Sequence, residues 1–204
     1  MKILCVARNY RLHAAELNNQ VPTEPVFFLK PDSALLMKRQ PFFYPDFSND
    51  VHHELEIVVR IDRVGKCIEP RFAHKYYNSV ALGIDFTARD MQAGLKQKGL
   101  PWALAKGFDD SAVLGPFVTL EELGKGIGDL NFSLKKNGET VQVGNTRDMI
   151  FSVDELIAYV SRFMTLKTGD LIYTGTPAGV GPVQIGDVLE GELEGRQLLT
   201  CRVK

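Results

Sequence analysis

The sequence has little of what marks secreted, membrane-spanning or nucleic-acid-binding proteins. Its 204 residues include three cysteines with no close spacing, so we expect no disulfide framework and a reducing compartment. No apolar run is long enough to cross a membrane, and residues 1–6 contain no leader pattern. Twenty-four basic and 25 acidic residues leave a formal net charge of -1, which provides no strong field for nucleic acid or anionic lipid. We therefore expect a cytoplasmic protein whose partners are small molecules or a second copy of itself.

Parts of two familiar motifs occur in this sequence, but neither motif is complete. His53 and Glu54 start the zinc-protease pattern, but Ile57 stands where the second histidine is required. Residues 174–182 are rich in glycine and threonine, yet no Gly-Lys-Ser/Thr follows, so they are not a P-loop. Their glycines would still let a ligand approach the backbone, and their hydroxyls can bind a carboxylate or a phosphate.

Length and local patterns predict one domain over residues 1–204 that is mainly β with a few helices (α+β). Hydrophobic residues make up 45% of the chain, enough for a sizeable core. Asn137-Gly138 is a strong hairpin signal, and three short strands with Gly-Asp or Gly-Arg turns follow between residues 169 and 199. Such spacing favours a sandwich, barrel or roll. Helices are expected at residues 87–98 and after a capping box that starts at Ser152.

Three carboxylates stand out on two predicted strands. In residues 50–59, Glu54 and Glu56 are two apart, so they leave one face of a strand with Cα atoms about 6.5 to 7 Å apart. Asp85 ends the apolar run 79–86, which is typical of a buried strand. An all-oxygen set without cysteine or paired histidine suits Mg²⁺ or Mn²⁺. Two simpler interpretations stay open: the glutamates lie on a solvated strand face, and Asp85 caps the following helix.

A second group of candidates lies on predicted helices. His13 and Glu16 are three apart in the helical pattern 10–17, so they can form a hydrogen bond that makes the imidazole a water-activating base. Arg89 and Gln92 have the same spacing near the Asp85 strand and can point at what Asp85 holds. Both pairs also have a simpler explanation, as solvated surface residues. Lys106 is alone in the apolar stretch 100–108, where it either reaches water or faces an anion.

Several separated segments together resemble the fumarylacetoacetate hydrolase family, in particular its small single-domain members such as acylpyruvate hydrolases and oxaloacetate decarboxylases. The resemblance runs in order over nearly the whole chain. The matching runs are Arg-Asn-Tyr at 8–10 with His13 and Glu16, Phe-Leu-Lys-Pro at 28–31, His-Glu-Leu-Glu at 53–56, Asp-Phe-Thr-Ala-Arg-Asp at 85–90 with Gln92, Lys-Gly-Leu-Pro-Trp at 98–102 leading to Lys106, and Thr-Gly-Thr-Pro-Ala-Gly-Val-Gly at 174–181. One departure is Ala7, where many relatives have glycine.

The resemblance implies a β-roll, assembly as a homodimer, and one Mg²⁺ or Mn²⁺ ion held by Glu54, Glu56 and Asp85. It also implies that His13 and Glu16 are catalytic residues on a mobile lid, residues 8–20, and that Lys106 is both catalytic and substrate-binding. The other substrate-binding residues that it implies are Arg8, Arg89, Gln92 and Thr176.

The implied reaction is hydrolysis of a carbon-carbon bond in 2,4-diketo acids (acylpyruvates), which releases pyruvate and a carboxylic acid. The alternative is an oxaloacetate decarboxylase or keto-enol tautomerase that uses the same site. A third hypothesis is a catalytically silent dimeric scaffold. We expect the walls around the acyl group to come from residues 18–24 and 32–50.

Overall fold

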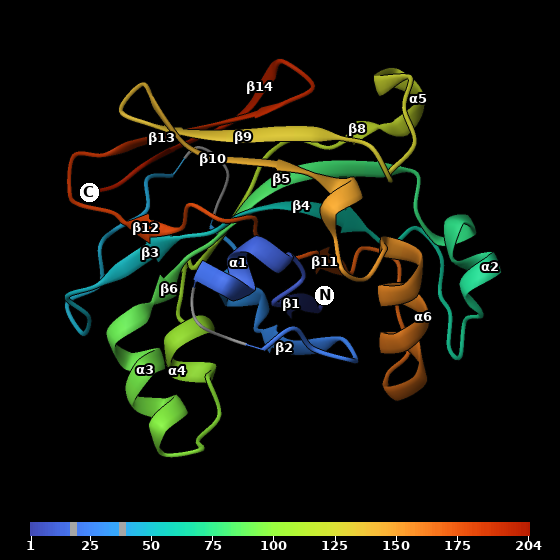
Figure 1. The fold of residues 1–204 in the computed structure, drawn as a ribbon, viewed down its shortest axis with the longest axis horizontal. Helices are drawn as coiled ribbons and strands as arrows, with labels where there is room; N and C mark the ends of the chain where they lie inside the picture. Colours follow the sequence, from blue (N-terminus) through green and yellow to red (C-terminus); the bar gives the residue numbers. More distant parts are fainter. Residues whose placement is uncertain (17–19, 37–39) are drawn as a thin grey trace.

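The strands of the chain form three sheets in the computed structural model, which describes residues 1–16, 20–36 and 40–204 (Figure 1). The seven-stranded sheet has the order β2 (Val26–Lys30), β1 (Ile3–Ala7), β11 (Leu171–Tyr173), β4 (Leu55–Arg60), β5 (Ser79–Asp85) and β7 (Ala112–Leu114), with β8 (Val118–Thr119) also paired to β5. The four-stranded sheet has the order β10 (Glu139–Asn145), β9 (Asn131–Lys136), β13 (Val188–Leu193) and β14 (Arg196–Arg202). The small sheet joins β12 (Gly181–Pro182), β3 (Val51–His53) and β6 (Thr87–Ala88).

Short helices surround the two larger sheets (Figure 1). The α-helices are α1 (Arg11–Glu16), α2 (Pro70–Ala73), α3 (Arg89–Gln97), α4 (Ala103–Lys106), α5 (Leu120–Leu123) and α6 (Val153–Phe163). The 3-10 helices are η1 (Asp32–Ala34), η2 (His74–Tyr76) and η3 (Thr146–Asp148). This composition confirms the prediction of a mainly β, α+β fold. None of the helices in the described ranges is long and apolar enough to cross a membrane.

The core lies between the four-stranded sheet and the seven-stranded sheet. Leu55 and Leu82 from the large sheet share one buried cluster with Leu134 and Leu189 from the other, and full burial of such a side chain contributes roughly 1.5–3 kcal/mol. The sheets approach closely at Gly191, where a Cβ atom would lie 3.0 Å from Leu82 Cδ1. The central strands are therefore covered on both faces, and every residue of β5 is buried.

Two local signals in the sequence are confirmed. Asn137 and Gly138 both have left-handed backbone angles, φ 54° and φ 85°, as a two-residue hairpin between β9 and β10 requires. Ser152 caps α6, because its side chain accepts from the N–H of Glu155 while the Glu155 carboxylate accepts from the N–H of Ser152.

Three expected elements have different bounds. The strand expected at 50–59 is interrupted at Glu54, because β3 pairs with β6 and β12 whereas β4 pairs with β5 and β11. The helix expected at 87–98 begins at Arg89, since residues 87–88 form β6. The helix expected at 10–17 begins at Arg11, and residues 17–19 of the expected lid lie outside the described residues.

Candidate active site

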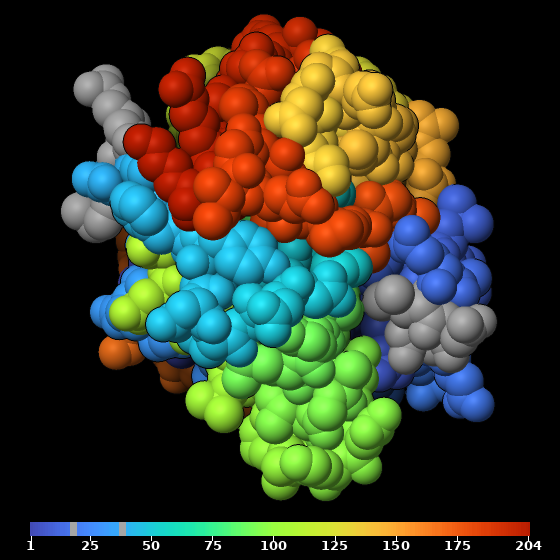
Figure 2. Space-filling model, turned by 90° about the vertical axis from the view of Figure 1, so that its left-hand side faces the viewer, coloured from blue at the N-terminus to red at the C-terminus, as the bar shows by residue number. Residues whose placement is uncertain are grey.

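A cavity opens beside the ends of β4 and β5, and nearly all residues singled out in the sequence line it. Its walls come from β1, β2, α1, α3, α4 and the segment after β11. The lining residues are Val6, Ala7, Arg8, His13, Phe28, Glu54, Glu56, Asp85, Arg89, Gln92, Lys96, Trp102, Lys106 and Thr176. In the space-filling view of Figure 2, the green residues of α3 and the blue N-terminal residues appear on the same face of the molecule. Glu16 is the one predicted site residue that does not line the cavity.

The three predicted metal ligands converge at the inner end of this cavity. One carboxylate oxygen from each of Glu54, Glu56 and Asp85 lies within 4.8 Å of the others. Glu54 is 6% exposed and the other two are 1% exposed, so the interpretation as a solvated strand face is wrong. The interpretation of Asp85 as a helix cap is also wrong, because Ala88 is the N-terminal capping residue of α3.

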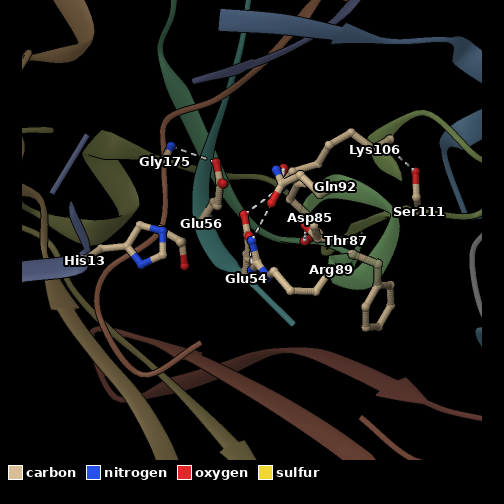
Figure 3. Close-up of polar contacts among 12 residues, drawn as sticks. His13, Glu54, Glu56, Asp85, Thr87, Arg89, Gln92, Lys106, Ser111 and Gly175 are labelled. Carbon is tan, nitrogen blue, oxygen red and sulfur yellow. Dashed lines mark hydrogen bonds and ion pairs between the residues drawn. The ribbon is translucent and has the colours of Figure 1, made fainter. Parts of the chain in front are cut away.

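Cationic side chains lie beside Glu54 and Asp85 (Figure 3). Lys106 Nζ lies 2.8 Å from Glu54 Oε2 and 2.9 Å from Asp85 Oδ2. Arg89 Nη2 lies 2.6 Å from Glu54 Oε1. Lys106 therefore does not reach water, and Arg89 is not a solvated helix residue, since both pair with the carboxylates from the adjoining helices.

Lys30 is a functional candidate that the sequence analysis missed. Its side chain is completely buried, with Nζ 2.8 Å from Asp85 Oδ1. The same ammonium donates to the carbonyl of Lys106 and to the carbonyl and hydroxyl of Ser111, so it ties β2 to the segment that carries Lys106. The available signal was a charged residue at the end of the apolar run 25–29, directly before Pro31.

Electrostatics distinguishes the two glutamates. Burial raises the pKa of the Glu54 carboxyl, but Lys106 and then Arg89 outweigh it and hold the pKa below its ordinary value. Burial raises the pKa of Glu56 well above its ordinary value, and the neighbouring Asp85 and Glu54 raise it further. Glu56 is thus the carboxylate whose ionised form most needs an additional positive charge.

The residues present fit a divalent cation. Glu56 receives one hydrogen bond among the described residues, from the N–H of Gly175 at 2.7 Å (Figure 3). Asp85 Oδ1 is buried and accepts no hydrogen bond of good geometry in the described part of the chain, although Lys30 Nζ is close to it. An all-carboxylate donor set with such under-used oxygens suits a hard ion such as Mg²⁺ or Mn²⁺. The three acids are the groups that would hold it.

His13 and Glu16 form the predicted hydrogen bond. His13 Nδ1 lies 3.1 Å from Glu16 Oε2, and Glu16 Oε1 accepts from the N–H of Gly179 at 3.0 Å. His13 is 5% exposed and lines the cavity, so it is not a surface histidine. In Figure 3 it appears on the opposite side of the glutamates from Lys106. Because Nδ1 faces Glu16, Nε2 is the nitrogen left to accept a proton.

The other predicted binding residues differ in how their polar groups are engaged. Gln92 is buried and its Oε1 accepts from Arg89 Nη1 at 2.8 Å. Thr176 donates its hydroxyl to the Leu55 carbonyl at 2.8 Å and accepts from Gln142 Nε2 at 2.9 Å. The hydroxyl proton of Thr176 is therefore engaged with β4. Arg8 is half-buried and has an uncommon left-handed backbone, φ 60°.

The expected origin of the cavity walls is wrong for the described residues. None of residues 20–24, 32–36 or 40–50 lines the cavity; residues 18, 19 and 37–39 lie outside the described ranges. The apolar walls come instead from Phe28, Trp102 and the end of β1. Helices α3 and α4 pack beside β2 and β6 and so create this wall. These contacts join segments that are distant in sequence, so the wall was not predicted from local patterns.

Comparisons with known proteins agree with this geometry. Residues 2–204 match the family described as fumarylacetoacetate (FAA) hydrolase C-terminal. Over 195 residues the chain is 42% identical to "Oxaloacetate decarboxylase, mitochondrial" of Dictyostelium discoideum, covering 95% of this chain and 89% of that protein. Over 199 residues it is 42% identical to an oxaloacetate tautomerase of Escherichia coli (strain K12), covering 98% and 91%.

A solved structure extends the likeness to a metal complex. The crystal structure of fumarylpyruvate hydrolase from Pseudomonas aeruginosa in complex with Mn²⁺ and pyruvate matches with a TM-score of 0.93 and 36% identity, covering 100% of this chain and 89% of that one. Because the family match spans almost every residue and these relatives share a third or more of the sequence, the chain belongs to the fumarylacetoacetate hydrolase family.

Proposed function

We propose that the protein is a divalent-metal-dependent hydrolase that cleaves a carbon-carbon bond in 2,4-diketo acids, releasing pyruvate and a carboxylic acid. The observation that carries the proposal is that a buried histidine, oriented by a glutamate, lines the same cavity as three convergent carboxylates. A water-activating base opposite a metal-ligand set is what hydrolysis needs. Assembly as a homodimer and a cytoplasmic location belong to the same proposal and are argued from the family resemblance and the composition.

Each residue has a role that its contacts support. When bound to Glu54, Glu56 and Asp85, a divalent ion supplies Lewis acidity at the keto oxygen and a fixed position for the keto acid. Lys106 and Arg89 hold the Glu54 carboxylate in its ionised form, and Arg89 is itself oriented by Gln92. Arg89, Gln92 and Lys106 also line the space that a keto acid would occupy.

The proposed hydrolysis uses the free nitrogen of His13. Water gives a proton to His13 Nε2 while its oxygen bonds to carbon 4 of the diketo acid, and the tetrahedral oxyanion then collapses. The carbon 3–carbon 4 bond breaks, its electron pair passes to carbon 3 as the enolate of pyruvate, and a proton returned to carbon 3 completes pyruvate. The Nδ1–H to Glu16 hydrogen bond selects the tautomer in which Nε2 is the nitrogen that can accept a proton, and the Glu16 carboxylate stabilises the imidazolium that forms during the reaction.

The second candidate function is decarboxylation or keto-enol tautomerisation of oxaloacetate. The names of the Dictyostelium and Escherichia relatives favour it. Both reactions pass through an enolate or enol of a 2-keto acid but need no water nucleophile. The two candidates therefore share the carboxylates and Lys106 and differ in their dependence on His13.

The experiment that separates the candidates is His13→Ala, measured as pyruvate release from acetylpyruvate and from oxaloacetate with Mg²⁺ or Mn²⁺ present. Loss of the general base should lower hydrolysis by about 10²-fold or more and leave decarboxylation largely intact. His74→Ala, at an exposed histidine of η2, is the matched control. Equal losses in both reactions would refute the division of roles, and no turnover of any keto acid by the unmodified protein would support the silent scaffold.

A further inference from the structure

A buried glutamine that does not line the cavity contacts the chain on both sides of Glu54. Gln142, on β10 of the four-stranded sheet, is 1% exposed. Its Oε1 accepts from the N–H of Leu55 at 3.0 Å and also lies 3.0 Å from His53 Nδ1. Because His53 ends β3 and Leu55 begins β4, one amide oxygen holds both ends of the interruption at which Glu54 lies.

The other end of the same amide contacts the segment after β11. Gln142 Nε2 donates to the Thr176 hydroxyl at 2.9 Å and to the Pro177 carbonyl at 3.1 Å. The same segment supplies the N–H of Gly175, which donates to Glu56 (Figure 3). A side-chain amide has two donor hydrogens and an oxygen with two lone pairs, so all four positions of Gln142 are used. This amide therefore links the surroundings of both glutamates.

Hydroxyl groups take over from strand pairing beside the glutamates. β11 ends at Tyr173. Beyond it, Thr174 donates its hydroxyl to the Ile57 carbonyl at 2.9 Å. Thr176 donates in the same way to the Leu55 carbonyl at 2.8 Å. Buried backbone groups need such partners, but a bond from a side chain is only as well placed as that side chain, so whatever holds the segment after β11 also sets the path of β4.

The place of Gln142 follows from an irregularity in β10. Two neighbouring residues of β9 pair with Thr140 and Gln142, so Val141 is one extra residue on β10, as in a β-bulge. Bulges redirect side chains and are frequent beside active sites. Gly179 lies against this bulge, since a Cβ atom there would be 2.1 Å from the Val141 carbonyl oxygen. The bulge thus supports the segment after β11 at two positions, through the Gln142 amide and at Gly179.

We propose that Gln142 is a positioning residue for the divalent ion. By fixing the interruption between β3 and β4 relative to the segment after β11, it keeps the carboxylates of Glu54 and Glu56 directed at one point. It acts through these contacts and not on the substrate, since it does not line the cavity. Hydrogen bonds from outside the coordination sphere commonly orient metal ligands. The inference rests on the metal dependence in the proposed function and applies to both candidate reactions.

A purely structural role for Gln142 makes a different prediction. Loss of a buried, fully hydrogen-bonded side chain lowers the stability of any fold, and in that case stability would fall without a specific effect on the ion. Ser161 on α6 provides the matched comparison, because it is buried, accepts from the N–H of Ile68 and donates to the Ala158 carbonyl. Ser161→Ala should lower stability and leave the binding of Mn²⁺ unchanged.

The experiment measures binding of Mn²⁺ to the metal-free protein by titration calorimetry, with urea unfolding of the metal-free protein beside it. Gln142→Met keeps the length of the side chain and removes its four hydrogen bonds. We expect Mn²⁺ to bind about 10-fold more weakly or worse, as for the loss of an outer hydrogen-bond partner of metal ligands. The electron paramagnetic resonance spectrum of the bound Mn²⁺ should also change, because it depends on the arrangement of the ligands.

A second variant and a surface control accompany this change. Gln142→Asn keeps a polar amide at the buried position, which favours folding, but it is one carbon shorter and cannot reach the partners on both sides. We expect it to weaken Mn²⁺ binding in the same direction. Gln184→Met, at an exposed glutamine, should leave the affinity and the spectrum unchanged.

The outcomes distinguish this inference from the proposed function. Weaker Mn²⁺ binding in both Gln142 variants, with Ser161→Ala and Gln184→Met unchanged, would support the positioning role. Mn²⁺ affinities close to that of the unmodified protein in both Gln142 variants would overturn that role alone. Equal weakening in Ser161→Ala, or failure of both Gln142 variants to fold, would overturn it too, because the glutamine would then serve general stability. No binding of Mn²⁺ by the unmodified protein would overturn the proposed function and the positioning role together.

Discussion

The carboxylate side of the cavity and its histidine side are built in different ways. On the carboxylate side, Asp85 is on a strand whose residues are all buried, and Lys30 and Lys106 hold its two oxygens. On the histidine side, His13 is on a six-residue helix, and Glu16 connects it to the neighbouring segment through one hydrogen bond to Gly179. The carboxylates are fixed by the core of the fold, whereas the base depends on a few local contacts.

The difference follows from what each helix or strand can do alone. A helix of six residues is far too short to be stable by itself, so the position of α1 is set by its tertiary contacts. Asn9 provides the main anchor, since its side chain donates to the carbonyls of Phe151 and Thr174 and accepts from the N–H of Phe151. Metal ligands need a constant geometry, which central strands provide. A base that must admit substrate and water can stand on a less constrained element.

The largest expected effect is on the carboxylate side. Asp85→Asn removes one of the three carboxylates, and we expect turnover to fall by about 10³-fold or more, because Lewis-acid catalysis is worth several kcal/mol and each 1.36 kcal/mol is tenfold. Mn²⁺ should also raise the melting temperature of the unmodified protein and have little effect on the variant. Steady-state kinetics and thermal unfolding with and without Mn²⁺ measure both.

The matched control for this change is Asp46→Asn, at an exposed aspartate outside the cavity. It should behave as the unmodified protein in both measurements. Turnover of Asp85→Asn within a few-fold of the unmodified protein would show that the three acids do not hold an essential ion, and the distinction between the two sides of the cavity would lose its basis.

The next effect concerns the folding of the carboxylate side. Lys30→Met keeps the length of the side chain but removes the ammonium beside Asp85 Oδ1 and leaves Lys106 as the remaining cation at this carboxylate. Breaking a buried pair costs about 3–5 kcal/mol of unfolding free energy. The loss should be larger in the metal-free protein, since a bound divalent ion supplies positive charge to the same carboxylate. Urea unfolding with and without Mn²⁺ measures both values. Lys167→Met, at an exposed lysine, is the control.

Thr176→Val tests whether the hydroxyl of Thr176, in the segment after β11, stabilises the fold or binds the substrate. The hydroxyl donates to the Leu55 carbonyl and accepts from Gln142, so its loss should cost about 1–3 kcal/mol of stability and leave KM unchanged. A raised KM with unchanged stability would instead support the substrate-binding role that the family resemblance implies. Chemical denaturation and steady-state kinetics on the same variant decide between them.

The sequence predicted local features and single residues better than their surroundings. Asn137-Gly138 and the Ser152 capping box are signals contained in a few neighbouring residues, and both are confirmed. The expectation that Glu54 and Glu56 lie together is confirmed, although the strand that was expected to carry both is interrupted at Glu54. The residue types of the site could therefore be predicted from the sequence, whereas their arrangement in space could not.

What the sequence did not predict depends on contacts between distant segments. Lys30 is 55 residues from Asp85, and nothing near it in sequence shows that β2 ends beside the buried aspartate. The interruption at Glu54 also has no local signal, since the chain there only changes partners, from the small sheet to the large one. Trp102 and Phe28 form cavity walls through the packing of α4 on β2, which was not predicted.

The smallest expected effect lies on the histidine side and isolates the orientation of the base. In Glu16→Gln the side chain keeps its size, but its amide cannot accept from both His13 Nδ1–H and the Gly179 N–H, because one end is now a donor. Either the imidazole changes tautomer and Nε2 becomes protonated, or the bond to Gly179 is lost. We expect hydrolysis to fall by about 10-fold through this loss of orientation, while stability changes by less than about 0.5 kcal/mol because Glu16 is partly exposed. Glu139→Gln, at an exposed strand end, is the control. A fall in stability that accounts for the lost activity would mean that the Glu16 contacts serve the fold, and that both sides of the cavity are equally part of the core.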